Sequence, residues 1–150
     1  MHNIVRTASD NVHFRSLILQ LDNLLQLVDG KDHTFYAQFN NVETIKNVVL
    51  FFENEIPVGC GAFKSIDNQT IEIKRMYVEP TFRKTGIAST ILNELEHWAK
   101  EENFSIAILE TGKKLENAIS LYKKVGYLET ENYGQYKGVE SSVCFKKILK

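Results

Sequence analysis

The chain has 150 residues, of which 43% are apolar and 25% are charged, which are ordinary proportions for one globular domain with a hydrophobic core. Its formal net charge of -1 gives no overall positive surplus for neutralising phosphates, which disfavours a nucleic-acid partner. No apolar run is long enough to cross a bilayer, and residues 1–10 lack the apolar core of a secretory signal, so we expect a cytoplasmic protein without a membrane partner.

The first third of the chain predicts one strand and one helix. A short strand is expected over Asn3–Thr7, and Ser9 or Asp10 is the expected N-cap of the helix that follows. Apolar residues recur there at helical spacing up to Asp29-Gly30, namely Leu17, Leu21, Leu24, Leu25 and Val28. Residues 31–40 show no clear period and are interpreted as a loop with room for a short helix.

An antiparallel meander is predicted next. Its three strands are Val48–Phe52, Val58–Ile66 and Thr70–Val78. Polar turns over residues 53–55 and 67–69 separate them, which is typical of strands joined by hairpins.

The hydrophobic period then changes to that of helices. One helix has its apolar face at Ile87, Ala88, Ile91, Leu92, Leu95, Trp98 and Ala99, and a second at Leu115, Ala118, Ile119, Tyr122 and Val125. A buried-type strand, Ser105–Glu110, lies between them, and further strands begin at Tyr127 and at Ser142. This order predicts a mixed α/β (α+β) fold with helices covering a mixed sheet, and without repeats or linkers we expect one domain over residues 1–150.

The bend after the third meander strand suits a phosphate. The strand runs into Pro80, and a helix opens at about Gly86, where unpaired N–H groups and a partial positive charge are expected. Gly86 lets the backbone approach a ligand and Ala88 keeps the next turn small, while Arg83 and Lys84 add mobile positive charge. These residues predict a pyrophosphate cradle, although a basic turn before an amphipathic helix explains them equally well.

Other phosphate and metal motifs are missing from the sequence. There is no G-x-x-x-x-G-K-[ST] loop, and Gly59-Cys60-Gly61 has Lys64 where a dinucleotide fingerprint needs its third glycine. The four histidines show no metal-ligand spacing, so no metal is predicted. Cys60 and Cys144 form no C-x-x-C pair, and we expect reduced thiols without a covalent role.

Two segments resemble a known family. The run Arg83-Lys-Thr-Gly-Ile-Ala88 is similar to the R-x-x-G-x-[GA] signature of the GNAT superfamily of acetyl-CoA-dependent N-acetyltransferases. Ala118–Tyr127 is similar to that family's A-I-x-L-Y-x-x-x-G-[FY] helix, and the strand Ile108–Thr111 lies between the two motifs. The resemblance covers roughly Val48 to Lys150 and implies a mostly antiparallel sheet of about seven strands with about four helices.

The resemblance also implies a donor site for acetyl-CoA. It assigns cofactor binding to Met76, Tyr77, Val78, Arg83, Lys84, Thr85, Gly86, Ile87, Ala88, Ser89, Asn117 and Tyr122. Backbone groups of Met76 and Val78 would pair with the pantetheine arm, the amides of residues 83–88 would bind the pyrophosphate, and a splay between two strands would admit the thioester. The asparagine that many members place seven residues before the helix tyrosine is Leu115 here, and Asn117 lies on a different helical face.

Acetyl transfer needs a proton donor for the departing thiolate. Tyr122, a phenol of reference pKa about 10, is the expected acid, although a core aromatic on an apolar helix face is the alternative. A backbone N–H near Val78 is the expected donor to the tetrahedral oxyanion.

The transfer also needs a base for the amine, and Glu72 is the candidate. Strand alternation places Glu72 on one face with Lys74, Met76 and Val78, which is the side assigned to the cofactor. A surface pair between Glu72 and Lys74 is the competing interpretation, and Glu110 is a weaker candidate base.

Aromatic residues predict the acceptor site and leave its ligand open. Phe35, Tyr36, Phe39, Tyr133 and Tyr136 are candidates to line a pocket for a small-molecule amine. A protein amine remains an alternative acceptor. A non-catalytic acyl-CoA sensor and a nucleotide-binding regulatory domain are alternatives to an enzyme. Either a monomer or a homodimer is compatible with the sequence.

Overall fold

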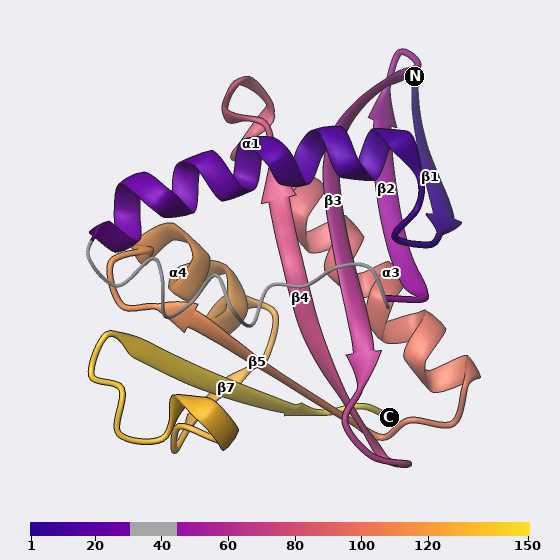
Figure 1. Cartoon of the computed structure of the whole chain (residues 1–150). Coiled ribbons are helices and arrows are strands. Elements are labelled where there is room, and N and C mark those ends of the chain that lie inside the picture. Colours follow the sequence, from indigo (N-terminus) through magenta and orange to yellow (C-terminus); the bar gives the residue numbers. More distant parts are fainter. Residues whose placement is uncertain (31–44) are drawn as a thin grey trace. The chain divides into compact units, whose positions relative to one another are not determined.

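The computed structural model describes residues 1–30 and 45–150, which contain seven strands and three α-helices (Figure 1). The strands are β1 (His2–Thr7), β2 (Asn47–Glu53), β3 (Ile56–Ser65), β4 (Thr70–Val78), β5 (Ile106–Gly112), β6 (Leu128–Thr130) and β7 (Ser142–Ile148). The helices are α1 (Val12–Asp29), α3 (Ile87–Glu101) and α4 (Glu116–Lys124), with short 3₁₀ turns at Pro80–Phe82 and Gly134–Tyr136. About four helices were expected, so that number is slightly wrong for the described residues. The interpretation of residues 31–40 lies outside them.

The strands follow the order β1-β2-β3-β4-β5-β7-β6 in one sheet. The pairs β1–β2, β2–β3, β5–β7 and β6–β7 are antiparallel, while β4 pairs with β5 in parallel. A parallel pair requires a crossover connection, which the chain supplies as α3. The expectation of a mixed sheet is confirmed.

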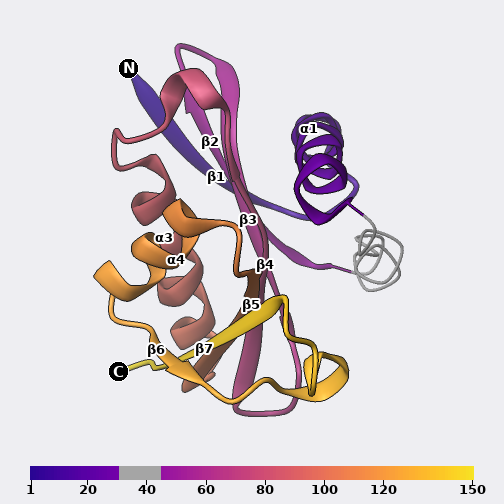
Figure 2. The ribbon, with the colours of Figure 1, turned by 90° about the vertical axis from the view of Figure 1, so that its left-hand side faces the viewer.

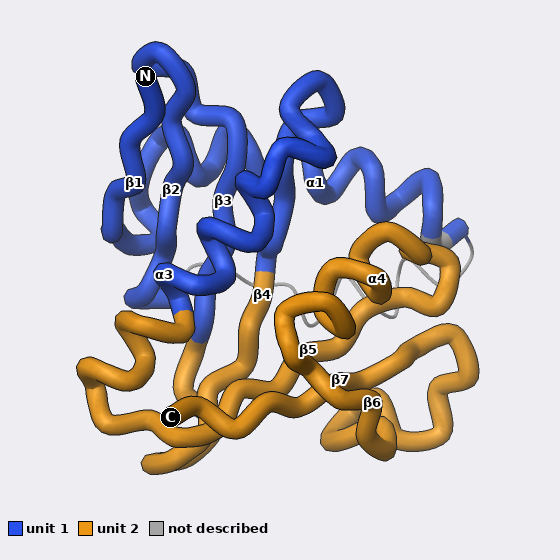
Figure 3. Tube along the Cα trace, turned by 180° about the vertical axis from the view of Figure 1, so that it is seen from behind, with its two compact units in different colours: residues 1–63, 75–95 blue, residues 64–74, 96–150 orange. Residues whose placement is uncertain are grey.

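The chain forms two compact units, which Figure 3 colours separately. The first contains residues 1–63 and 75–95, and the second contains residues 64–74 and 96–150. Strand β4 begins in the second unit and ends in the first. The expectation of one domain over residues 1–150 stays a prediction.

In the first unit, helices lie on both faces of the meander. Figure 2 shows α1 on one side of the strands and α3 on the other. The buried apolar residues of α1 pack on β2 and β3; they are Phe14, Leu17, Ile18 and Leu21. On the α3 side β3 carries Gly61, where an added Cβ would lie 2.5 Å from Met76 Sδ and 2.9 Å from Ile91. The G-x-G pair of β3 therefore admits close packing of α3.

The N-cap of α1 differs from the prediction. Asn11 caps the helix, because its Oδ1 accepts bonds from the amides of His13 at 2.8 Å and Phe14 at 3.3 Å. Ser9 is buried, and its own amide donates to the carbonyl of Ile45. The predicted caps were wrong because α1 begins at Val12, so Asn11 and not Ser9 or Asp10 occupies the N-cap position.

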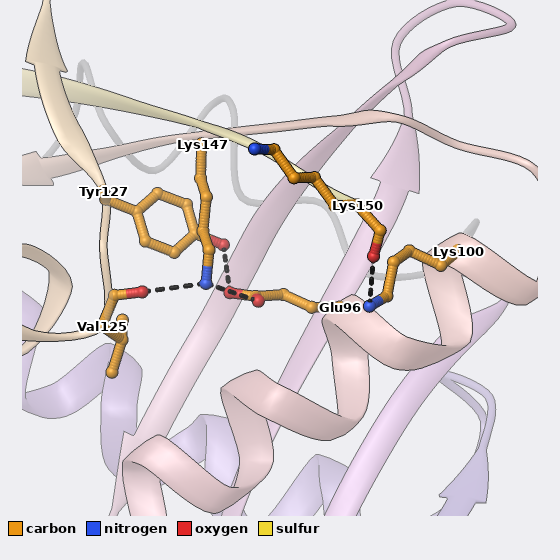
Figure 4. A network of polar contacts seen from close by, with 6 residues as sticks. All are labelled: Glu96, Lys100, Val125, Tyr127, Lys147 and Lys150. Atoms are coloured by element: carbon orange, nitrogen blue, oxygen red, sulfur yellow. Dashed lines mark hydrogen bonds and ion pairs between the residues drawn. The ribbon is translucent and has the colours of Figure 1, made fainter.

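In the second unit, a partly buried ion pair joins β7 to α3. Lys147 Nζ donates to Glu96 Oε1 and to the carbonyl of Val125, both at 2.8 Å, and Tyr127 donates to Glu96 Oε2 at 3.0 Å (Figure 4). Glu96 is only 7% exposed, so these partners satisfy a carboxylate that would otherwise be costly to bury. The network fixes the strand-helix junction after α4.

None of the helices in the described part of the chain is long and apolar enough to span a membrane.

Candidate active site

The bend between β4 and α3 has an unusual backbone. Pro80–Phe82 forms a 3₁₀ turn, and the hydroxyl of Thr85 donates to the carbonyl of Phe82 at 2.6 Å. Lys84 and Gly86 both have left-handed φ values, +64° and +87°. Turns of this kind direct successive N–H groups into one concavity, which favours anions. Because α3 begins at Ile87, its first unpaired amides follow directly.

The bend is open to a ligand. Arg83, Lys84, Thr85 and Gly86 are exposed, and a Cβ added at Gly86 would meet nothing within 4 Å. The residues present therefore fit a pyrophosphate group: exposed residues directly before a helix N-terminus, a glycine that permits close approach, and the cation of Lys84.

Arg83 differs from its expected role as a mobile cation. Its Nε donates to the carbonyl of Val78 at 2.8 Å, and its guanidinium carbon lies 5.6 Å from the ring centroid of Tyr77. Tyr77 in turn donates to Gln20 of α1 at 3.2 Å. Arg83 is thus anchored at the end of β4, because a guanidinium can bond a carbonyl and lie over an aromatic ring at once.

Strand β4 is irregular at Arg75, whose φ of +58° is left-handed. Such a residue in a strand shifts the alternation of side chains that follows it, as β-bulges do. Tyr77 belongs to the core cluster that includes Cys60 and the buried face of α1, whereas Met76 lies against Gly61 on the opposite face.

The irregularity changes the environment of Glu72. Glu72 Oε1 lies 3.9 Å from Lys64 Nζ, and Lys64 shares a face of β3 with Cys60 because side chains alternate along a strand. Glu72 therefore lies on the Cys60 face of β4, not on that of Met76. The expectation that Glu72 and Met76 share a face was wrong, because strict alternation does not continue through Arg75.

Glu72 is a buried carboxylate with three polar neighbours in the second unit. Its exposed fraction is 4%, so the alternative of a surface pair is wrong, although Lys74 Nζ does lie 3.9 Å from Oε1. Lys64 Nζ lies at the same distance. The hydroxyl of Tyr133 donates to Oε2 at 2.6 Å.

Tyr133 lies on the loop between β6 and β7. Asn132 holds the loop by donating to three carbonyls, those of Tyr136, Val139 and Ser142. The Tyr133 and Tyr136 rings meet edge to face at 5.7 Å. Burial and then the charge of Glu72 raise the pKa of Tyr133, so its phenol stays protonated. Both tyrosines were predicted to line the acceptor site. The other residues predicted for that site, Phe35, Tyr36 and Phe39, lie outside the described residues.

Tyr122 is a buried phenol on α4. It is 6% exposed, and its ring lies 5.9 Å from that of Tyr127 and 6.1 Å from that of Phe145. Burial and then the charge of Glu110 raise its pKa, so it remains protonated at neutral pH. This state suits a general acid and suits a core aromatic equally.

The start of α4 has no side-chain cap. Leu115 occupies the N-cap position without a capping bond, and Asn117 in the first turn is exposed. The cofactor role of Asn117 stays a prediction.

The pairing of β4 with β5 is short. Its register runs over Thr70–Ile106, Ile71–Ala107 and Glu72–Ile108, although β5 continues to Gly112 and pairs with β7 along its whole length.

The two cysteines are buried thiols. Burial raises the pKa of Cys60 to about 12, and its Sγ donates to the carbonyl of Arg75. Burial also raises the pKa of Cys144 to about 11. Both thiols are therefore protonated at neutral pH.

Sequence comparison identifies the family. Residues 17–127 match the family described as the acetyltransferase (GNAT) family. The "IAA acetyltransferase" of Azospirillum brasilense is 38% identical over 61% of this chain and 61% of its own length. The uncharacterized N-acetyltransferase YsnE of Bacillus subtilis is 24% identical over 97% of this chain and 92% of its own length. In the first three curated relatives, the matched stretch spans 61%, 35% and 40% of their length, less than two thirds.

Solved structures agree on the fold. A Klebsiella pneumoniae protein assigned as an acyl-CoA N-acyltransferase superposes with a TM-score of 0.84 at 24% identity, covering 100% of this chain and 99% of that one. A GNAT acetyltransferase from Elizabethkingia anophelis, solved with acetyl-CoA bound, gives a TM-score of 0.71 at 20% identity, covering 99% and 98%. The fold is that of acyl-CoA-dependent N-acyltransferases. The chain belongs to the GNAT acetyltransferase family.

Proposed function

We propose that this chain is an N-acetyltransferase that moves the acetyl group of acetyl-CoA directly to a primary amine of a small molecule. The observation that carries the proposal is the open bend before α3, where Lys84 and Gly86 have left-handed φ values and residues 83–86 are exposed, an arrangement that favours anions. Membership of the GNAT family supports acyl-CoA as the ligand of that site.

The donor site is proposed to use backbone groups more than side chains. The amides of residues 84–89 bind the pyrophosphate, with Lys84 adding charge. Backbone groups of Met76, Tyr77 and Val78 pair with the pantetheine arm. The carbonyl of Val78 accepts a bond from Arg83, and the amide of Val78 is the proposed donor to an oxyanion. Arg83 holds the bend against the end of β4 through its contacts with Val78 and Tyr77.

Bound acetyl-CoA supplies an activated acetyl group, and the side chains of this chain handle the protons. The amine nitrogen forms a bond to the acetyl carbon while the carbon–sulfur bond breaks. Glu72 receives the proton that leaves the amine, and Tyr122 gives its proton to the departing thiolate. The raised pKa of Tyr122 keeps the phenol protonated at neutral pH, so its proton is available to the sulfur as the carbon–sulfur bond breaks.

Two measurements test the proposal. A thermal-shift titration with CoA, ATP and NAD should show stabilisation by CoA alone. Release of free thiol from acetyl-CoA should then depend on an added amine from a panel of amino acids, polyamines, arylalkylamines and a peptide N-terminus. Binding of CoA without thiol release in any arm would favour a non-catalytic sensor, and stabilisation by ATP or NAD alone would contradict the proposal.

A further inference from the structure

The contacts of Glu72 distinguish its two oxygens. Oε1 faces two ammonium groups, those of Lys64 and Lys74, each at 3.9 Å. Oε2 accepts the hydroxyl proton of Tyr133 at 2.6 Å. With 4% of its surface exposed, Glu72 offers an incoming amine little direct access.

Tyr133 is more accessible than the carboxylate it contacts. It is half-buried on the loop before β7, and the three bonds of Asn132 fix that loop. A phenol that donates its proton still has lone pairs that accept one. Tyr133 therefore offers an incoming amine more surface than Glu72 does, and its oxygen can still accept a proton.

We infer that Tyr133 is a catalytic residue that relays the acceptor's proton to Glu72, and that the acceptor is a basic alkylamine. This inference rests on the proposed acetyl transfer. As one N–H bond of the ammonium group breaks, a new O–H bond forms at Tyr133, while the original Tyr133 proton moves to Glu72 Oε2. The nitrogen loses a second proton as the amide forms, and this proton replaces the one that Tyr122 gives to the thiolate. Charge balances, because the carboxylate gains the ammonium proton and the thiolate leaves as a neutral thiol.

The environment favours a concerted relay over a free tyrosinate. Burial and the adjacent charge of Glu72 disfavour ionisation of Tyr133, so it has to gain one proton as it gives up another. Such a relay matters only for amines that are protonated at neutral pH, such as alkylamines with a pKa of roughly 10. Weakly basic acceptors arrive neutral and need it far less.

A pair of isosteric acceptors separates relay from structural support. The probes are 2-phenylethylamine, which is protonated at pH 7.5, and O-benzylhydroxylamine, which is neutral at that pH. For Tyr133→Phe we expect kcat/KM to fall roughly 100-fold with the first and less than about fivefold with the second, in line with general base catalysis. Tyr136→Phe, a change on the same loop, is the matched control and should treat the two amines alike.

The outcomes are distinct. Equal losses with both amines in Tyr133→Phe would overturn the relay, as would no loss with either. Wild-type turnover of O-benzylhydroxylamine alone would overturn the assignment of a basic acceptor. CoA release with neither amine nor any member of the panel above would instead contradict the proposed acetyl transfer itself. A CoA thermal shift equal to wild type verifies that Tyr133→Phe is folded.

Discussion

Replacing Gly86 probes the proposed diphosphate site most directly. At a φ of +87°, any side chain is strained by about 1–2 kcal/mol. Because a Cβ there would meet nothing within 4 Å, no steric cost within the protein is added. For a chain of this length, such a loss lowers Tm by roughly 3–6 °C. Gly86→Ala should therefore remain folded.

Gly86→Glu adds a charge beside the site. At about 6 Å in an effective dielectric constant of 20, one carboxylate repels one phosphate charge by roughly 3 kcal/mol, which solvent screening halves. Losing one charge-assisted amide bond adds about 1.5 kcal/mol. The total of about 3 kcal/mol corresponds to a hundredfold weaker affinity for acetyl-CoA.

Isothermal titration calorimetry with acetyl-CoA measures this effect. Gly138→Glu is the matched control, since Gly138 also has a positive φ of +77° and open space for a Cβ. It should lose similar stability and bind acetyl-CoA normally. An unchanged dissociation constant in Gly86→Glu would refute the assignment of the bend.

Three further results are expected. Tyr122→Phe removes the proposed general acid, so it should lower kcat roughly 10- to 100-fold while the dissociation constant of acetyl-CoA changes less than about twofold. Undiminished turnover would show that Tyr122 is not the general acid. Lys147→Met leaves the buried carboxylate of Glu96 without its cation, which should cost about 2 kcal/mol of stability and lower Tm by roughly 5–8 °C in differential scanning calorimetry. An unchanged Tm would contradict a stabilising role for Lys147. Because burial raises the thiol pKa to about 12 at Cys60 and about 11 at Cys144, both thiols are protonated at pH 8. Iodoacetamide should label neither cysteine in the native protein and both in guanidinium. Rapid labelling of either cysteine in the native protein would show an accessible thiolate and contradict this expectation.

Much of the fold was predictable from patterns within short stretches of the sequence. The apolar runs of β2 and β3, the helical period of α3 and the glycine that follows α4 each depend on neighbours within a few residues. The bend around Gly86 was predictable for the same reason, because a helix N-terminus after a glycine-containing loop is a local feature. The resemblance to the family motifs extended these predictions to the residues of the candidate active site.

Contacts between distant residues decided the rest. Ser9, a predicted cap, instead donates its amide to the distant carbonyl of Ile45, and Asn11 caps α1. Alternation failed along β4 because Arg75 adopts a left-handed conformation.

The sequence by itself determined where most strands and helices lie and which family the motifs belong to, and it predicted an anion site at the bend before α3. Only the tertiary structure decided the surroundings of Glu72. Tyr133 is 61 residues away in the chain, and its hydrogen bond exists because the loop before β7 folds back over β4. Periodicity reports the neighbours of a residue along one element, whereas a buried carboxylate is defined by partners from several elements.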